Sequence, residues 1–254
     1  MEPLISSALY ERFVELRQTM INNEVGSPAQ VFAPVGAPIS EHAQAMPRIL
    51  YVGKATRGFG EPDLGGLAVA ASGSTKVIDE WLLPGGSAFW QFIRAVLQLL
   101  AKRCDQPADT RLLEYFGWSN LAKIGDVDGN PDNWSLDIQK EICREALAVE
   151  IASFAPTATI LATTNYAEKE IVFPLFSEDD WRFDTPNKDR IAFKKHPEFG
   201  LLVWTNHPQG MRPAGTRAKV QEFVADLVIK HWRGEPLPEC VWSASIRSGP
   251  STVS

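Results

Sequence analysis

Short apolar runs alternate with amphipathic segments along most of this chain. Four of the runs are rich in β-branched and aromatic residues and end at a glycine or a polar residue, which is typical of strands buried on both faces of a parallel sheet. These four predicted strands are residues 48–53, 115–121, 159–164 and 201–205. Apolar residues at helical spacing predict helices over residues 4–22, 88–103, 135–154 and 216–232, with shorter helices near 77–82 and 166–172.

This alternation predicts a three-layer α/β/α sandwich with a four-stranded, mostly parallel central sheet. We expect residues 1–45 to form an N-terminal helix and a proline-rich connector packed on the core, 46–233 to form the main domain, and 234–254 to be a C-terminal tail. Right-handed crossovers bring the carboxyl ends of all four strands to one edge of the sheet. Gly53, Asn120, Thr163 and His207 should therefore face one crevice.

The composition favours a globular protein with a substantial core, because 44% of the 254 residues are hydrophobic. No apolar run approaches the length of a membrane span, and the N-terminus lacks the layout of a signal peptide. The three cysteines are far apart without CxxC spacing, which predicts reduced thiols and a cytoplasmic protein. A net charge of −6 disfavours tight non-specific coating of DNA but is compatible with a local basic patch.

A histidine lies in the segment that joins the fourth predicted strand to the last helix, Thr205–Met211. Open α/β sheets place their chemistry in such segments, after the carboxyl ends of strands. The alternative is an ordinary loop histidine. Because three other strand ends are predicted at the same edge, the pattern favours a functional role for His207.

A long glycine-rich segment follows the first strand and begins with Gly53–Gly60. It fits neither the G-x-G-x-x-G nor the G-x-x-x-x-G-K-[ST] pattern, so we expect no nucleotide cofactor. Its glycines would let the backbone approach a ligand closely, or would simply form a tight turn.

Polar residues after the second strand are further candidates. Asn120 can donate and accept hydrogen bonds, which suits reading the edge of a base or holding a water, although it could also satisfy its own turn. Lys123 could contact a phosphate or be a solvated surface lysine. Asp126 and Asp128 could act in acid–base catalysis or form a solvated acidic turn; their run lacks the final glutamate of a calcium loop.

Three motifs follow the first, second and fourth predicted strands in the order found in the uracil-DNA glycosylase superfamily. On these motifs the chain resembles a divergent member of that superfamily. Gly58-Phe59-Gly60 is similar to the G-P-F-G loop of the single-strand-selective branch. Ser119–Lys123 resembles the N-[VL]-[VA]-K strand end of bacterial branches, and Asn206–Met211 resembles the H-P-[ST] loop. The resemblance covers roughly residues 46–232.

The resemblance implies a monofunctional DNA N-glycosylase that flips a non-standard base out of DNA and hydrolyses its N-glycosidic bond. It implies no cofactor, no metal and no iron–sulfur cluster, and we expect a monomer. His207 would stabilise the departing base, and Asn120 would read it. The substrate-binding residues would be Gly53, Lys54, Ala55, Thr56, Arg57, Phe59, Lys123, Asn206, Gln209 and Met211, with Met211 wedging the duplex gap.

The chain departs from the family pattern beside the first strand. Ala55 stands where uracil-specific branches carry the acid or asparagine that positions water, and Lys54 stands where the iron–sulfur branch has glutamate. Asp126 is then a catalytic candidate for activating water; the others are Glu61, Asp63 and Asp128. Arg57 replaces the aromatic gate, which favours a bulky modified pyrimidine, as in phage DNA, over plain uracil and a role in antiviral defence.

Three alternatives remain open. The chain could be a catalytically silent relative that binds nucleobases or DNA, because the expected carboxylate is missing and the net charge is acidic. It could hydrolyse small nucleosides or nucleotides on the same fold. It could also be an unrelated Rossmann-like enzyme.

Overall fold

A mixed sheet forms the centre of this computed structural model, which describes residues 1–39, 44–55, 65–82, 86–107, 111–183, 191–211 and 214–238. Among these residues the sheet has eight strands in the order β1-β3-β5-β4-β7-β10-β9-β8. Its parallel centre consists of β5 (Phe116–Asn120), β4 (Ile49–Gly53), β7 (Ala158–Ala162) and β10 (Gly200–Thr205). Antiparallel edges are formed by β1 (Glu2–Pro3), β3 (Val35–Gly36), β9 (Ile191–His196) and β8 (Arg182–Phe183).

The four predicted strands are thus present and parallel, but the prediction of a four-stranded sheet is incomplete. Every residue of β4, β5 and β7 is buried, which explains why their sequences are continuous apolar runs without alternation. Three of the missed strands have only two residues each, too few for any periodicity to register. A separate two-stranded sheet pairs β2 (Pro28–Val31) with β6 (Ile124–Asp126).

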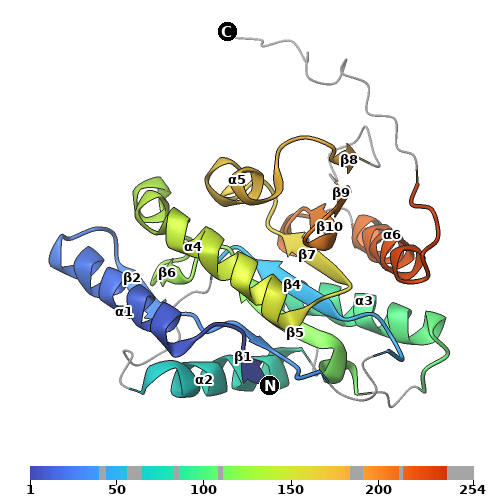
Figure 1. The fold of residues 1–254 in the computed structure, drawn as a ribbon, viewed down its shortest axis with the longest axis horizontal. Coiled ribbons are helices and arrows are strands. Elements are labelled where there is room, and N and C mark those ends of the chain that lie inside the picture. The colour runs from blue at the N-terminus through green and yellow to red at the C-terminus, as the bar shows by residue number, and fades with distance from the viewer. Residues whose placement is uncertain are drawn as a thin grey trace, which may run out of the picture.

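Helices connect the parallel strands and cover the sheet (Figure 1). The bounds are α1 (Ser7–Asn22), α2 (Gly66–Trp81), α3 (Ala88–Arg103), α4 (Asn133–Phe154), α5 (Phe173–Phe176) and α6 (Ala214–Trp232). Three short turns are η1 (Leu112–Tyr115), η2 (Glu168–Val172) and η3 (Pro208–Gly210). The helix predicted near 77–82 is the end of the longer α2. Helix α4 begins earlier than predicted because Asp132 caps it, accepting from the N–H of Ser135.

Helices α3 and α4 lie on opposite faces of the sheet. The ring of Trp118 in β5 contacts Trp90 of α3, whereas the hydroxyl of its neighbour Ser119 donates to Glu150 of α4. Successive side chains of a strand point to opposite faces, so the two helices cover different sides. Figure 1 shows α4 passing in front of β4 and β5, and α6 lying alongside α3.

The N-terminal segment belongs to the same fold as the rest of the described chain. Strands β1 and β3 extend the central sheet beside β5, and α1 packs against α2 and α4. No helix within the described ranges is long and apolar enough to cross a membrane. The tail predicted for residues 234–254 lies outside the described residues from position 239 onward.

The strand order places four carboxyl ends at one edge of the sheet. Gly53 pairs in register with Asn120, and Ala162, which precedes Thr163, pairs with Thr205. The fourth strand continues directly into the segment that contains His207. The edge predicted from right-handed crossovers is therefore the edge at which these residues lie.

Candidate functional site

His207 is anchored at the junction between β10 and η3 by its backbone. Its N–H donates to Oγ1 of Thr164 (2.9 Å), and Thr164 itself follows β7 with a positive φ of 55°. Trp204 also links the ends of β10 and β7, because its indole N–H donates to Oγ1 of Thr163 (3.1 Å). The histidine is thus positioned by the end of a neighbouring strand and not by its own loop alone.

Arg217 of α6 holds the other side of this loop. Its guanidinium donates to the backbone carbonyl of Pro208 (3.2 Å) and to the side-chain oxygen of Gln91 in α3 (3.4 Å). One arginine therefore connects the histidine loop to two helices. Pro208 is buried, whereas Gln209 and Gly210 are exposed at the tip of the loop.

The imidazole of His207 lies in surroundings that keep it neutral. Its ring stacks on Phe89, with centroids 5.6 Å apart and planes 16° from parallel. Burial, and then the positive charge of Lys54, lowers the pKa of His207 to about 4. Its Nδ1 accepts the N–H of Gln209 (3.4 Å), so the neutral ring carries its proton on Nε2. The ring therefore presents an N–H donor at neutral pH.

Gly53 lies against both the Asn120 side chain and the ring of Phe89. A Cβ at position 53 would overlap the side-chain oxygen of Asn120 and lie 3.2 Å from the ring of Phe89. Only glycine lets the Asn120 amide lie over the end of β4. Asn120 is 2% exposed, and its Nδ2 has no hydrogen-bond partner within the described residues. A buried donor without a partner costs about 1–3 kcal/mol, which a ligand's acceptor would offset.

Lys123 does not lie where the sequence placed it. The side chain is fully buried, and its ammonium pairs with Glu150 of α4 (2.8 Å). It also donates to the hydroxyl of Ser119 (3.1 Å) and to the carbonyl of Asn120. Both the predicted phosphate contact and the solvated surface lysine are therefore wrong. Lys123 instead holds the backbone of Asn120 from behind.

Asp126 lies in β6, in the separate two-stranded sheet. Its carboxylate accepts the N–H groups of Ser27 (3.3 Å) and Asp128 (3.2 Å), and Asp128 is exposed in the same turn. Among the described residues, no contact joins it to His207 or Asn120. The structure gives these two aspartates the turn-forming arrangement that the sequence left as their alternative.

The remaining predicted residues are divided between the site and other surroundings. Lys54 and Ala55 are partly buried directly after β4, and Asn206 is partly buried beside His207. Met211 is buried at 2% exposure, so its predicted role as a wedge in a DNA duplex does not fit this position. Thr56, Arg57, Phe59, Glu61 and Asp63 lie outside the described residues.

Three positioning residues were missed by sequence reasoning. Phe89 contacts His207 and the ring of Tyr51 (4.4 Å), which also donates its hydroxyl to the Phe89 carbonyl (3.2 Å). Thr164 and Arg217 hold the histidine loop. In the sequence, the aromatic pair at the start of α3 and the threonine pair after β7 were the features that could have indicated Phe89 and Thr164. Both look like ordinary core and turn residues until the strands are assembled.

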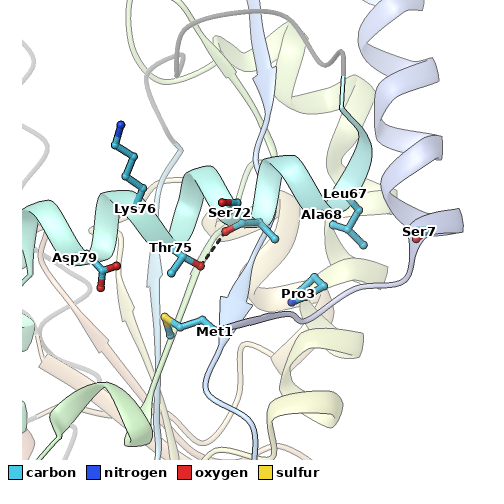
Figure 2. A pocket seen from close by; sticks show the side chains of 10 residues that line it. Met1, Pro3, Ser7, Leu67, Ala68, Ser72, Thr75, Lys76 and Asp79 are labelled. Atoms are coloured by element: carbon cyan, nitrogen blue, oxygen red, sulfur yellow. Dashed lines mark hydrogen bonds between the residues drawn. The ribbon is translucent and has the colours of Figure 1, made fainter.

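Two grooves lie away from this edge. One of about 570 Å³ lies between the N-terminal segment and α2 and includes Met1, Leu67 and Thr75 (Figure 2). Another of about 520 Å³ is lined by Trp181 and Lys194 beside β8 and β9. Neither includes a residue of the strand-end cluster, which consists of Gly53, Lys54, Phe89, Asn120 and His207. Searching the described residues also finds no group of three or more His, Cys, Asp or Glu that could hold a metal ion.

The strand-end cluster brings together two hydrogen-bond donors and an aromatic ring. The ring of His207 stacks on Phe89, and Gly53 lies against both Phe89 and the Asn120 side chain, at an edge that also carries the charge of Lys54. Such a set can hold a planar heterocycle and stabilise negative charge that develops on it.

No family model matches the chain, and no curated protein sequence matches it either.

Proposed function

We propose that this protein is a DNA glycosylase, a divergent relative of the uracil-DNA glycosylases built as a three-layer α/β/α sandwich. The observation that carries the proposal is the buried amide of Asn120, whose Nδ2 has no partner among the described residues, at the sheet edge that also carries the neutral His207. Two motifs that resemble the family, around Asn120 and His207, lie at the ends of β5 and β10 on one edge of the sheet, and the glycine-rich segment begins at Gly53, the last residue of β4.

In this proposal a flipped base enters the crevice edge-on. Asn120 donates its free N–H to an acceptor on the base and thereby selects the base edge. As the C1′–N bond breaks, negative charge develops on the base. The Nε2–H of His207 stabilises this charge by a hydrogen bond, and the imidazole keeps its proton. A neutral imidazole suits this role because it remains a donor throughout the reaction.

The substrate we propose is a modified base in place of plain uracil. Ala55 is small, and the sequence around it carries Thr56 and Arg57, so that no aromatic gate follows Gly53 at the family's position. A base with a bulky polar substituent, such as a glucosylated hydroxymethylcytosine of phage DNA, then fits the chemistry best. The protein would act as a cytoplasmic monomer in defence against such phages.

A second candidate function is binding without catalysis. No carboxylate of the described residues contacts His207 or Asn120, and Asp126 lies in another sheet. Without a group to activate the nucleophile, the same cluster would bind a nucleobase or DNA and release nothing.

Base release from a panel of duplex and single-stranded DNAs tests the proposal. The panel contains uracil, hydroxymethylcytosine and glucosylated hydroxymethylcytosine, and abasic sites are detected by alkaline cleavage. We expect His207→Ala to slow release by about 10²–10³-fold, as for the loss of one charge-stabilising donor. Asn120→Ala should remove base selection.

Matched controls separate the site from general damage. His231→Ala and Asn133→Ala change the same residue types on α6 and α4 and should leave release unchanged. Binding of modified DNA without release by the wild-type protein would favour the silent relative. Faster cleavage of free nucleosides than of DNA would favour a nucleoside hydrolase.

A further inference from the structure

Lys54 lies at the strand-end cluster, and none of the described carboxylates is its counter-ion. Its backbone carbonyl accepts the N–H of Ala122 (2.9 Å), which fixes the main chain at position 54 onto the end of β5. In the part of the chain that the structure describes, Lys76, Lys123 and Lys140 each pair with a carboxylate, but no carboxylate pairs with Lys54.

Lys54 follows directly on Gly53, the residue that lies against Asn120 and Phe89. Its charge reaches the imidazole and contributes to lowering the pKa of that ring, and burial lowers the pKa of Lys54 itself. A partly desolvated lysine spends a larger fraction of time as the neutral amine, which is the nucleophilic form. A lysine that serves only to contact phosphate gains nothing from burial, because it needs its charge.

The cluster also needs a nucleophile. The residue after Lys54 is Ala55, which can neither position nor activate water, and Asp126 is engaged in a turn of the other sheet. The donors of His207 and Asn120 can stabilise a leaving base but cannot attack the sugar. Within the described cluster, the side chain that can attack is the amine of Lys54.

We propose that Lys54 is the nucleophile of this site, forming a covalent imine with the deoxyribose, and that the protein therefore also cleaves DNA at abasic sites. The inference rests on the proposed glycosylase function and deepens it. It replaces the simple hydrolysis expected from the resemblance with a two-step reaction that has an additional strand-cleaving outcome.

The chemistry balances without any oxidant, reductant or cofactor. The neutral Lys54 amine forms a bond to C1′ while the C1′–N bond breaks, and the base leaves with the electron pair, held by His207, and takes a proton from solvent. The adduct nitrogen loses a proton, the C1′–O4′ bond opens, and O4′ takes up a proton to give an iminium at C1′. Water then releases the free aldehyde, or loss of a 2′ proton expels the 3′ phosphate and breaks the strand.

Borohydride trapping on DNA with a preformed abasic site tests this directly. Borohydride reduces the iminium to a stable amine, so the wild-type full-length protein should form a covalent complex with the DNA. Lys54→Met and Lys54→Arg should both lose it, while Lys219→Met, an exposed lysine on α6, should retain it. Tryptic mapping should locate the adduct on the peptide that spans residues 49–57.

The arginine variant separates a nucleophile from a phosphate contact. Lys54→Arg keeps the positive charge and should keep DNA affinity, but a guanidinium cannot form the imine. Equal melting temperatures of the variants would show that both are folded. Trapping by Lys54→Arg at the wild-type level, or no trapping by the wild-type protein, would overturn the proposal.

Failure of this inference can be told apart from failure of the proposed function. Preformed abasic DNA contains no base to be excised, so trapping does not depend on the glycosylase substrate, and His207→Ala should still be trapped. Release of a modified base without trapping would overturn the role of Lys54 alone. Trapping through Lys54 without release of any base would support that role and overturn the glycosylase proposal.

Discussion

His207 owes its properties to the side chains around it more than to its own loop. The ring of Phe89 covers one face of the imidazole, and Lys54 adds positive charge. Burial and charge repulsion therefore both lower the pKa of His207. The motif around His207 predicted a functional histidine but not its protonation state. That state depends on Phe89, which precedes His207 by more than a hundred positions in the chain.

The acid titration of His207 is the first prediction. The pKa of an ordinary histidine is about 6.5, whereas that of His207 in the folded protein is lowered to about 4. Between these values the unfolded chain binds more protons, so the free energy of unfolding rises with pH there. This contribution, about 3–4 kcal/mol before screening by solvent, is present above about pH 6.5 and is lost as the pH falls toward 4. NMR titration of the imidazole carbons measures the midpoint.

Phe89 variants provide the control for this titration. Phe89→Ala should raise the midpoint of His207 toward about 6.5, because water then reaches the ring. Phe89→Leu retains apolar cover and should leave the midpoint near the wild-type value. A wild-type midpoint close to 6.5 would contradict the neutral-donor role.

At the scale of elements, the junctions between strands and the following turns decide where the functional groups lie. The end of β7 holds the start of the histidine loop through Thr164, and α6 holds it through Arg217. The four core strands were predictable because buried parallel strands are continuous apolar runs. The two-residue edge strands were not, because their pairing depends on partners distant in sequence.

Removing the Thr164 hydroxyl is the second prediction. Thr164→Val keeps the shape but leaves the N–H of His207 without its acceptor, which should cost about 1–3 kcal/mol of stability and lower base release. Thr164→Ser keeps the hydroxyl and should stay near wild type in both. Denaturant unfolding and the base-release assay measure the two effects. Equal activity of the valine and serine variants would show that the anchor is unnecessary.

At the scale of the whole molecule, a buried ion pair joins the sheet to α4 directly behind the candidate site. Lys123 and Glu150 are both fully buried, and the ammonium of Lys123 also bonds the carbonyl of Asn120. Charge burial of this kind is stable only while both partners are present. The pair therefore couples the position of Asn120 to the packing of a helix on the opposite face.

Breaking this pair is the third prediction. Glu150→Gln leaves the Lys123 charge buried without a counter-ion and should cost about 3–5 kcal/mol, whereas Lys123→Met combined with Glu150→Met should recover much of that loss. Arg12→Ala breaks an exposed pair between α1 and α4 and should cost no more than about 1 kcal/mol. Chemical denaturation of the wild-type protein and of these three variants measures the free energies of unfolding. A cost for Glu150→Gln as small as that for Arg12→Ala would contradict the coupling.

The sequence by itself determined the four core strands and the shared edge at which Gly53, Asn120 and His207 lie, because buried strands and strand-end loops leave local patterns. Only the tertiary structure decided that Lys123 is a core residue paired with Glu150, that Asp126 lies in another sheet, and that Met211 is buried. Burial, charge pairing and the protonation of His207 arise from contacts between segments far apart in the chain, and local periodicity carries no record of those contacts.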